Sequence, residues 1–386
     1  MSMRKAVRFL ALLITLAQAM LLTTGCWDYH EVHHISFITT IGIDYKDKKY
    51  VLYAQALSFM NIAQREGERP TRHKAVVGVA TGDTVTDAMF NLYRSEQQFV
   101  YWGHISAIIF SRKALENVQI DSLVDSVNRF RELRYNVWVY GTDEPIDKLE
   151  NLAPYFGFSP YDSRLMKPDQ TYRQFSNIKP IYLNRFVSDY FENGKTVMIP
   201  KLDIDSTSWK EGGEQAPELI MNGCYIFSPR PYVGSLSEEE LKGRRYMDKH
   251  SVRMPMVIHR SGKAASLIVL NKPRVKIRPS VANGVARFDV KIRLQGNIDE
   301  LLQDIPLNEL ERQVEKNVEQ QVRETFEKGK KLNADVLNLT LPLFRYHYGT
   351  WKRTIGPSID MSKVELGRVE VSFLLQNTGK YKGRLR

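Results

Sequence analysis

The sequence predicts an α+β protein in which mixed β-sheets pack against helices, and the chain is long enough for two or three domains. Apolar residues make up 43% of the 386 positions and charged residues 26%, which is typical of a globular chain of this size. Segments of two-residue alternation are interspersed with segments of helical periodicity. The sequence contains no internal repeat and no low-complexity tract.

The first domain is expected at residues 26–152. Segments rich in β-branched and aromatic residues predict a hairpin of two strands, 35–45 and 50–57. Further strands are expected at 75–80, 104–110 and 135–140. Thr84 and Asp87 have the spacing of a helix cap, which predicts that a helix begins after Thr84. Two more helices are expected, at 120–130 and 146–152.

Residues 153–204 are expected to form a middle segment or small second domain. Four prolines and many aromatic residues in 153–180 predict an irregular, loop-rich stretch. A helix at 182–192 and a strand at 197–204 follow. Residues 205–217 (DSTSWKEGGEQAP) are rich in Gly, Ser and acidic residues and predict a linker.

The C-terminal domain is expected at residues 218–386. Residues 219–227 predict a strand, and 235–240 a turn into a short capped helix. The most distinctive element is a long helix at 306–328, ended by Gly329, with a continuous apolar stripe. The stripe consists of Leu310, Val314, Val318, Val322 and Phe326. Other strands are expected at 264–270, 273–278, 285–294 and 364–375.

The first 25 residues have the form of a lipoprotein signal peptide. Arg4, Lys5 and Arg8 precede an almost uninterrupted apolar run that ends at Leu22. Small residues then lead to Cys26, as in the bacterial lipobox, although Thr23 stands where that motif usually has Leu. We therefore expect a lipid on Cys26, with S-diacylglycerol on its thiol and an N-palmitoyl group. An ordinary secretory signal and a retained membrane anchor remain alternatives.

The other cysteine and the charge distribution limit the remaining possibilities. Cys224 has no intramolecular partner if Cys26 is lipidated, and its neighbours predict a small buried residue in a strand. The net charge is +11, and residues 242–293 contain fourteen basic and two acidic residues. This basic stretch could contact anionic headgroups or an acidic partner, or be a solvated face. No nucleic-acid partner is expected for an exported chain.

The sequence predicts no catalytic residue, no metal site and no cofactor. His30-Glu31-Val32-His33-His34 matches the zinc-hydrolase signature H-E-x-x-H, but it runs directly into a strand pattern instead of a helix. Phosphate-loop, dinucleotide and nucleophile-elbow motifs are absent from the sequence. His104 opens an apolar strand, which favours a structural role.

Several short segments, in order, resemble one family. They are Cys26-Trp27-Asp28 with Glu31, Ile41-Gly42-Ile43-Asp44, Gly82-Asp83-Thr84 with Asp87-Ala88, Gly103-His104, Asn222-Gly223, Gly234-Ser235-Leu236-Ser237 with Glu240, Asn333-Ala334-Asp335, Trp351 and Thr378-Gly379. Together they resemble the Ger(x)C family, the C subunits of spore nutrient germinant receptors.

The resemblance implies a non-enzymatic, three-domain α+β protein, anchored by lipid to the outer surface of the spore inner membrane. It also implies two integral membrane partners, an A subunit and a transporter-like B subunit. Trp27, Asp28 and Glu31 would then lie near the membrane or at an interface, with Trp27 either at the headgroups or packed on the first domain. A solute-binding lipoprotein of an envelope transporter is the alternative function.

Overall fold

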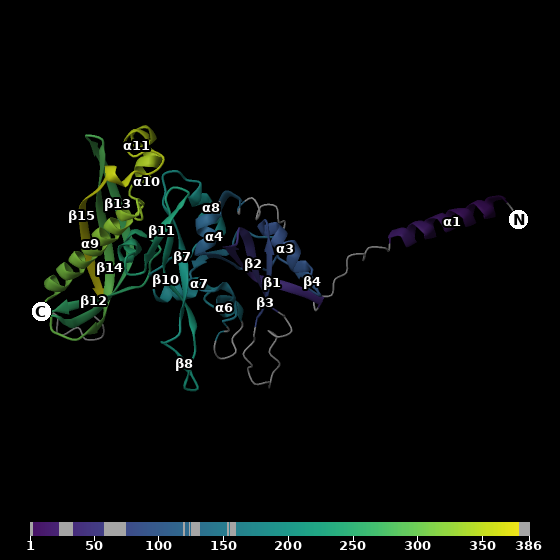
Figure 1. The fold of residues 1–386 in the computed structure, drawn as a ribbon, viewed down its shortest axis with the longest axis horizontal. Coiled ribbons are helices and arrows are strands. Elements are labelled where there is room, and N and C mark those ends of the chain that lie inside the picture. Colours follow the sequence, from purple (N-terminus) through teal and green to yellow (C-terminus); the bar gives the residue numbers. More distant parts are fainter. Residues whose placement is uncertain are drawn as a thin grey trace.

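The computed structural model describes residues 3–22, 34–57, 75–118, 120–122, 124, 132–152, 154 and 160–377. The N-terminal helix α1 (Met3–Leu22) extends away from the rest of the described chain, which contains two large sheets (Figure 1). No helix of the described part combines the length and hydrophobicity needed to cross a membrane. Mixed sheets with packed helices confirm the α+β prediction.

The first sheet has nine strands within the described residues. Its order is β11-β10-β7-β6-β5-β1-β2-β3, and β4 pairs with β1. The central strands β7, β6, β5 and β1 are parallel to one another, and β4 also pairs parallel with β1. The pairs β11–β10, β10–β7, β1–β2 and β2–β3 are antiparallel. The strands are β1 (Ile35–Lys46), β2 (Lys49–Leu57), β3 (Val76–Gly82), β4 (Phe99–Tyr101), β5 (Ala107–Ser111), β6 (Trp138–Thr142), β7 (Val197–Asp205), β10 (Glu218–Phe227) and β11 (Tyr232–Ser237).

Both faces of this sheet are buried. Ile108 of β5 belongs to a core shared with α3, α4 and α8, whereas its neighbour Ile109 belongs to a second core with α6. Because adjacent strand residues point to opposite faces, a continuous apolar run such as β5 fits a central strand covered on both sides. The covering helices are α3 (Val85–Tyr93), α4 (Arg112–Asn117), α6 (Ile146–Glu150), α7 (Pro168–Gln174) and α8 (Leu183–Tyr190).

Most elements predicted in the first half are confirmed. The predicted hairpin is β1 and β2, and the Thr84 side chain caps α3 by accepting the Asp87 N–H at 3.0 Å. The stretch 153–180 is more ordered than predicted, because it contains α7 and a short 3-10 helix, η3 (Pro160–Asp162). Most of the helix predicted at 120–130 lies outside the described residues.

The segment 205–217 is not a linker between separate sheets. β7 and β10 flank it and pair antiparallel, so both belong to the first sheet. The segment itself forms a small projecting hairpin of β8 (Lys210–Glu211) and β9 (Glu214–Gln215) (Figure 1). The chain leaves the first sheet only after Ser237, where β11 ends. The linker prediction was wrong because Gly, Ser and acidic residues suit a hairpin tip as well as a linker.

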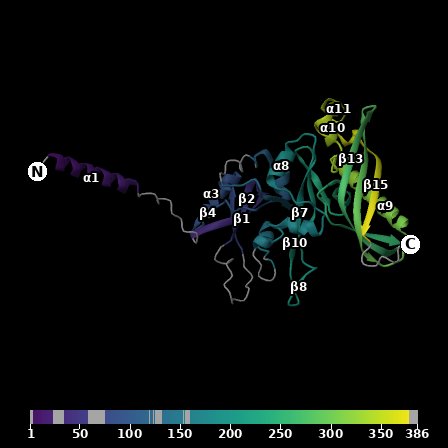
Figure 2. The same ribbon diagram turned by 180° about the vertical axis from the view of Figure 1, so that it is seen from behind.

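The second sheet lies at the end of the molecule farthest from α1 (Figures 1 and 2). Its four strands have the order β12-β13-β14-β15, and the parallel pair β14–β15 is joined through the long helix α9. The elements are η4 (Lys242–Met247), β12 (Met254–Arg260), β13 (Lys263–Ala282), β14 (Val285–Leu301), α9 (Leu307–Lys331), α10 (Leu341–Tyr346), α11 (Tyr348–Thr354), η5 (Met361–Lys363) and β15 (Val364–Asn377).

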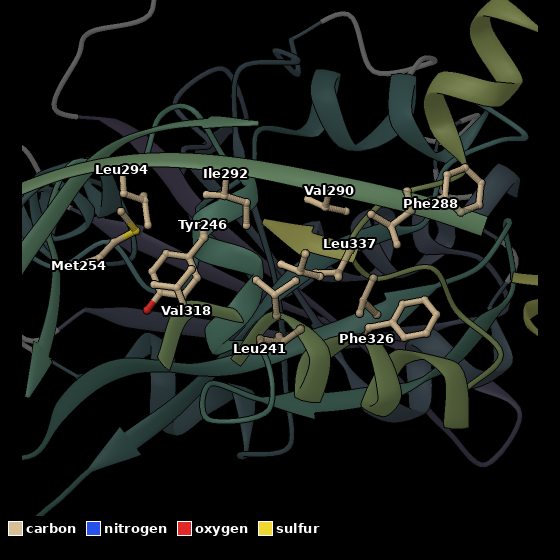
Figure 3. Close-up of a cluster of buried hydrophobic side chains, with 14 of the residues drawn as sticks. Leu241, Tyr246, Met254, Phe288, Val290, Ile292, Leu294, Val318, Phe326 and Leu337 are labelled. Carbon is tan, nitrogen blue, oxygen red and sulfur yellow. The ribbon is translucent and has the colours of Figure 1, made fainter. Parts of the chain in front are cut away.

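The apolar stripe predicted for the long helix is confirmed. All five stripe residues of α9 are buried, and Val318 and Phe326 lie opposite Phe288, Val290 and Ile292 of β14 (Figure 3). Leu241 and Tyr246, at η4, pack into the same core. The helix continues past Gly329 to Lys331, so the predicted end was too early.

Other elements in the second half also differ from the prediction, and the strand predicted at 285–294 continues to Leu301 as β14. The strands predicted at 264–270 and 273–278 are one strand, β13, with a register shift between Asn271 and Arg274. The strand β12 and the short helices α10 and α11 were not predicted. Ser237 and Glu240 do exchange the predicted capping hydrogen bonds, but the helical turn that follows is the 3-10 helix η4.

Candidate functional site: a charged pocket between the two sheets

The predicted anchor and membrane-proximal residues lie outside the described part of the chain. These residues are Cys26, Trp27, Asp28 and Glu31, together with His30 and His33 of the H-E-x-x-H match. His34, which is described, is exposed directly before β1. Within the described residues, no group of three or more His, Cys, Asp or Glu side chains is arranged to hold a metal ion.

His104 lies against aromatic rings in the loop before β5. Its ring centroid is 5.0 Å from that of Phe37 and 5.6 Å from that of Tyr101. Partial burial, and then the charge of Arg134, lower the pKa of His104. These contacts suit the structural role predicted for this residue.

The fold separates two groups of basic residues within the stretch 242–293. Arg244 and Arg245, on η4, line a pocket between the first sheet and the second. The basic residues of β13 and β14 instead alternate with buried residues and lie on the exposed face of the second sheet, opposite α9. The two parts therefore present different surfaces.

The pocket has a volume of about 410 Å³ and is lined from both halves of the chain. The first sheet and its helices contribute residues of β6, α7, α8, β7 and β10, together with the connections 177–182 and 195–196. η4 and the loop residue Asn338 contribute from the second half. The volume falls in the range of about 300–1,000 Å³ that is usual for small-molecule sites.

Arg245 is the most deeply buried cation of this pocket, with only 5% of its surface exposed. Its Nη1 donates to Asn177 Oδ1 at 3.2 Å, and its Nη2 donates to Tyr246 Oη at 2.8 Å. The Nε–H has no hydrogen-bond partner. Among the described residues, no carboxylate lies within 4.0 Å of the guanidinium, so neutral groups satisfy this cation only partly.

Asn177 links Arg245 to a more distant carboxylate. The Asn177 amide also donates to Oε1 of Glu238, so it bridges the cation and the acid. Burial raises the pKa of Glu238, and the positive charge of Arg245 opposes that rise. The bridge compensates the charge of Arg245 through an intervening dipole, which is weaker than a direct ion pair.

The other cations of the pocket differ, because they have carboxylate partners. Lys179 Nζ lies 2.8 Å from Asp248, and Lys195 Nζ lies 2.6 Å from Asp189. Arg185 also pairs with Asp189, at 3.2 Å. Arg244 is half-buried and donates to the carbonyl of Leu337 at 3.2 Å, without a carboxylate within 4.0 Å in the described chain. The pocket therefore has a local excess of positive charge at Arg244 and Arg245.

Apolar and aromatic side chains form the rest of the lining. The rings of Trp138 and Tyr182 stack with centroids 3.6 Å apart. Burial raises the pKa of Tyr172 to about 12, and its hydroxyl lies 3.1 Å from that of Ser251. Burial also raises the pKa of Cys224 to about 12, which keeps the thiol protonated and unreactive. The prediction of a buried strand cysteine is confirmed.

The sequence contains a signal for this site that the predictions above do not use. Arg244 and Arg245 follow the Ser237–Glu240 cap, but they lie within a basic stretch whose sequence alone does not set them apart from its other basic residues. Only the packing of η4 on α9 separates these two arginines from the others. The Gly243 N–H donates to Thr325 Oγ1 of α9 at 2.9 Å and holds η4 in place.

Two family models match the chain in order. The model described as the spore germination protein N-terminal domain matches residues 28–204. The model described as spore germination B3/GerAC like, C-terminal, matches residues 222–373. The interval between the two matches contains the 205–217 segment.

Individual proteins are similar over almost the whole chain. Spore germination protein KC of Bacillus subtilis (strain 168) is 22% identical over 368 residues, covering 90% of each chain. Spore germination protein B3 of the same organism is 22% identical over 382 residues, covering 92% of this chain and 94% of that protein. The crystal structure of the GerBC protein matches with a TM-score of 0.54 and 18% identity, covering 87% of this chain and 97% of that one, which shows a shared fold. The chain belongs to the Ger(x)C family of spore germination proteins.

Proposed function

We propose that this chain is a non-enzymatic, lipid-anchored subunit of a spore nutrient germinant receptor, acting with integral membrane A and B subunits. The observation that carries the proposal is the ordered match of both family models, which together extend from residue 28 to residue 373. The names of the relatives, all spore germination proteins, support the same process.

The proposed anchor is a lipid on Cys26. The basic and apolar segments before it form a signal peptide, and the first family match begins two residues after it. S-diacylglycerol and N-palmitoyl groups would hold the chain on the outer surface of the spore inner membrane. Such an anchor raises the effective concentration of the chain beside its membrane partners. Trp27, Asp28 and Glu31 would then lie next to the membrane.

The anchor is tested by Cys26→Ala, with Cys224→Ala as the matched control. We expect the first variant to leave the membrane fraction of spores, because no thiol remains for lipidation. The Cys224→Ala protein should stay there, since that thiol is buried in β10. Mass spectrometry of the N-terminal peptide identifies the lipid. A Cys26→Ala protein that remains at the membrane with an uncleaved α1 would support the retained-anchor alternative instead.

The receptor role is tested by co-purification and by gene deletion. A tagged chain should co-purify with two integral membrane proteins from spores, and deletion should slow the response to at least one nutrient without affecting spore viability. A normal response to every nutrient in a strain without paralogues would count against the proposal.

The alternative of a solute-binding lipoprotein is less well supported by the fold. That class predicts two lobes of similar topology around a ligand. Here one sheet has nine mixed strands and the other four, in different orders, within the described residues. The receptor proposal requires no such symmetry.

A further inference from the structure

We propose that the pocket between the two sheets is a binding site for a small organic anion with an apolar group, a carboxylate or a phosphate ester. Arg244 and Arg245 would receive the anion, and the wall around Trp138 and Tyr182 would receive the apolar part. The inference goes beyond the proposed function, because it assigns a ligand to this subunit itself and does not depend on the anchor or the membrane partners.

The charge of Arg245 favours an anionic ligand. A guanidinium that is 95% removed from solvent is costly unless an anion compensates it. The neighbouring Asn177, Tyr246 and Gln321 offer only neutral oxygen atoms, at 3.2, 2.8 and 3.4 Å. The carboxylate of Glu238 reaches this cation only through the Asn177 amide, so a bound anion would supply the direct compensation that the described residues lack.

The cations of this one pocket differ in how their charges are compensated. Lys179, Arg185 and Lys195 have carboxylate partners in Asp248 and Asp189. Asp169, the remaining acid of the lining, is exposed on α7. The two adjacent arginines of η4 thus account for the excess positive charge. Guanidinium groups present several N–H donors in a fixed plane, which suits a carboxylate or a phosphate group.

The donors of Arg245 are held in place before any ligand arrives. The Tyr246 hydroxyl donates to Gln321 Oε1 at 2.8 Å, so the ring that supports Arg245 is itself fixed to α9. Gly243 contacts α9 so closely that an added Cβ would lie 2.3 Å from the Gln321 carbonyl oxygen. A rigid, preorganised site loses less entropy when a ligand binds.

The apolar lining defines the rest of the ligand. The stacked pair Trp138 and Tyr182 and the side chains of Ile178, Met198 and Leu241 line the same space. A volume of about 410 Å³ accommodates a ring or short alkyl chain in addition to the anionic group. Inorganic anions alone would leave this surface without a partner.

The test is isothermal titration calorimetry of the full-length chain in detergent. The probes are benzoate, phenyl phosphate and the uncharged analogue benzamide. We expect saturable binding of benzoate or phenyl phosphate with a Kd of about 1 mM or tighter, and at least tenfold weaker binding of benzamide. Benzoate alone would identify a carboxylate site and phenyl phosphate alone a phosphate site. No saturable binding of either anion, or equal binding of benzamide, would overturn the proposal.

Variants then locate the site. Arg244 is only half-buried, so Arg244→Gln should fold, and we expect it to weaken anion binding at least tenfold. Arg245→Lys keeps the charge but loses the planar fork, and should weaken binding as well. The matched control is Arg260→Gln, which removes a basic residue of the same stretch that pairs with Glu309 outside the pocket. Unchanged affinity in Arg244→Gln, or an equal loss in Arg260→Gln, would contradict this location. Any of these failures would leave the receptor proposal intact.

Discussion

The Tyr225 hydroxyl, on β10, donates a 2.7 Å hydrogen bond to Asp143, which directly follows β6. The same carboxylate accepts the Arg112 Nε–H at 2.6 Å and lies 2.8 Å from Lys201 Nζ of β7. One aspartate thus connects α4 with three strands that are up to 82 residues apart in sequence. The cluster joins strands on both sides of the 205–217 hairpin.

Replacing Asp143 with Asn should destabilise the protein in a pH-dependent way. Burial alone would raise the pKa of Asp143, but the hydrogen bonds from Arg112, Lys201 and Tyr225 outweigh it and hold this pKa well below its ordinary value. The folded state therefore favours the ionised carboxylate of Asp143. The stability that this carboxylate contributes is present above about pH 4 and is lost as the pH falls toward the lowered pKa. Urea unfolding should show that the free energy of unfolding of Asp143→Asn is about 1–2 kcal/mol lower than that of the wild type at pH 7. The difference should become smaller in acid.

The control for this cluster is Asp162→Asn. Asp162 also pairs with a cation, Lys167, at 2.5 Å, but both side chains are about half exposed. Exposed pairs contribute about 0–1 kcal/mol, so the control should change stability little at any pH. A loss as large as that of Asp143→Asn would show that burial of the cluster is not the cause.

Glu150→Gln should stabilise the protein at neutral pH. Glu150 is fully buried in α6, neither carboxyl oxygen has a hydrogen-bond partner, and burial, followed by the charge of Asp147, raises its pKa well above the ordinary value. A raised folded pKa means that wild-type stability is greatest below about pH 4.3 and falls as the pH rises toward the folded pKa. The variant lacks this loss, so its free energy of unfolding at pH 7 should be about 1–3 kcal/mol higher.

The pH profile of Glu150→Gln separates this effect from simple repacking. Unfolding measured at pH 4 and pH 7 should show a gain that is larger at pH 7. Glu116→Gln, at an exposed position of α4, should leave both values within about 0.5 kcal/mol. An equal gain at both pH values would exclude ionisation of Glu150 as the origin.

Gly243→Ala should separate η4 from α9. The added Cβ would lie 2.3 Å from the Gln321 carbonyl oxygen and 2.6 Å from Val322 Cα, both backbone atoms of a rigid helix. Overpacking of this kind lowers the free energy of unfolding by about 1–3 kcal/mol. Gly349→Ala is the control, since the atom nearest to its Cβ is Arg353 Nη1 at 3.7 Å and the site lies within α11. There the added methyl should stabilise by about 0.5–1 kcal/mol, as thermal unfolding would show.

Arg293→Glu should stabilise the second sheet. Arg293 of β14 lies directly opposite Arg274 of β13, on the exposed face, and like charges in this position are unfavourable. Reversing one charge replaces repulsion by attraction, which should add about 0.2–1 kcal/mol in low-salt urea unfolding.

A double-mutant cycle at the same pair provides the control. Arg274→Glu alone should also stabilise, whereas the double variant restores two like charges and should lose the gain. Additive gains in the double variant would mean that the cross-strand pair is not the source. Raising the salt concentration should reduce all three effects.

The elements predicted well are those whose pattern is local. The hairpin of β1 and β2, the cap at Thr84 and the stripe of α9 depend on residues within one turn or one strand pair. Periodicity and capping chemistry identify such elements because neighbouring residues decide them. Even their boundaries shifted where another element packed against them, as for the end of α9 beyond Gly329.

The features missed depend on partners distant in sequence. Nothing near residues 205–217 shows that β7 and β10 are neighbours in one sheet, so a hairpin tip was interpreted as a linker. β12 was not predicted, and it gains its place by pairing with β13 and packing under α9. The sequence presents the basic stretch 242–293 as one unit. In the structure its arginines on η4 line the pocket, whereas its basic residues on β13 and β14 lie on the exposed face of the second sheet.

The sequence by itself determined the α+β class and the family, and it predicts an export signal with Cys26 as the expected lipid site. These conclusions rest on local periodicity, on a short N-terminal motif and on ordered segments along the chain. Only the tertiary structure decided which strands share a sheet, that Arg245 is buried among neutral groups, and that Asp143 receives three donors. The physical reason is that burial and electrostatic compensation depend on which distant segments meet in space, and single-sequence periodicity contains no information about those partners.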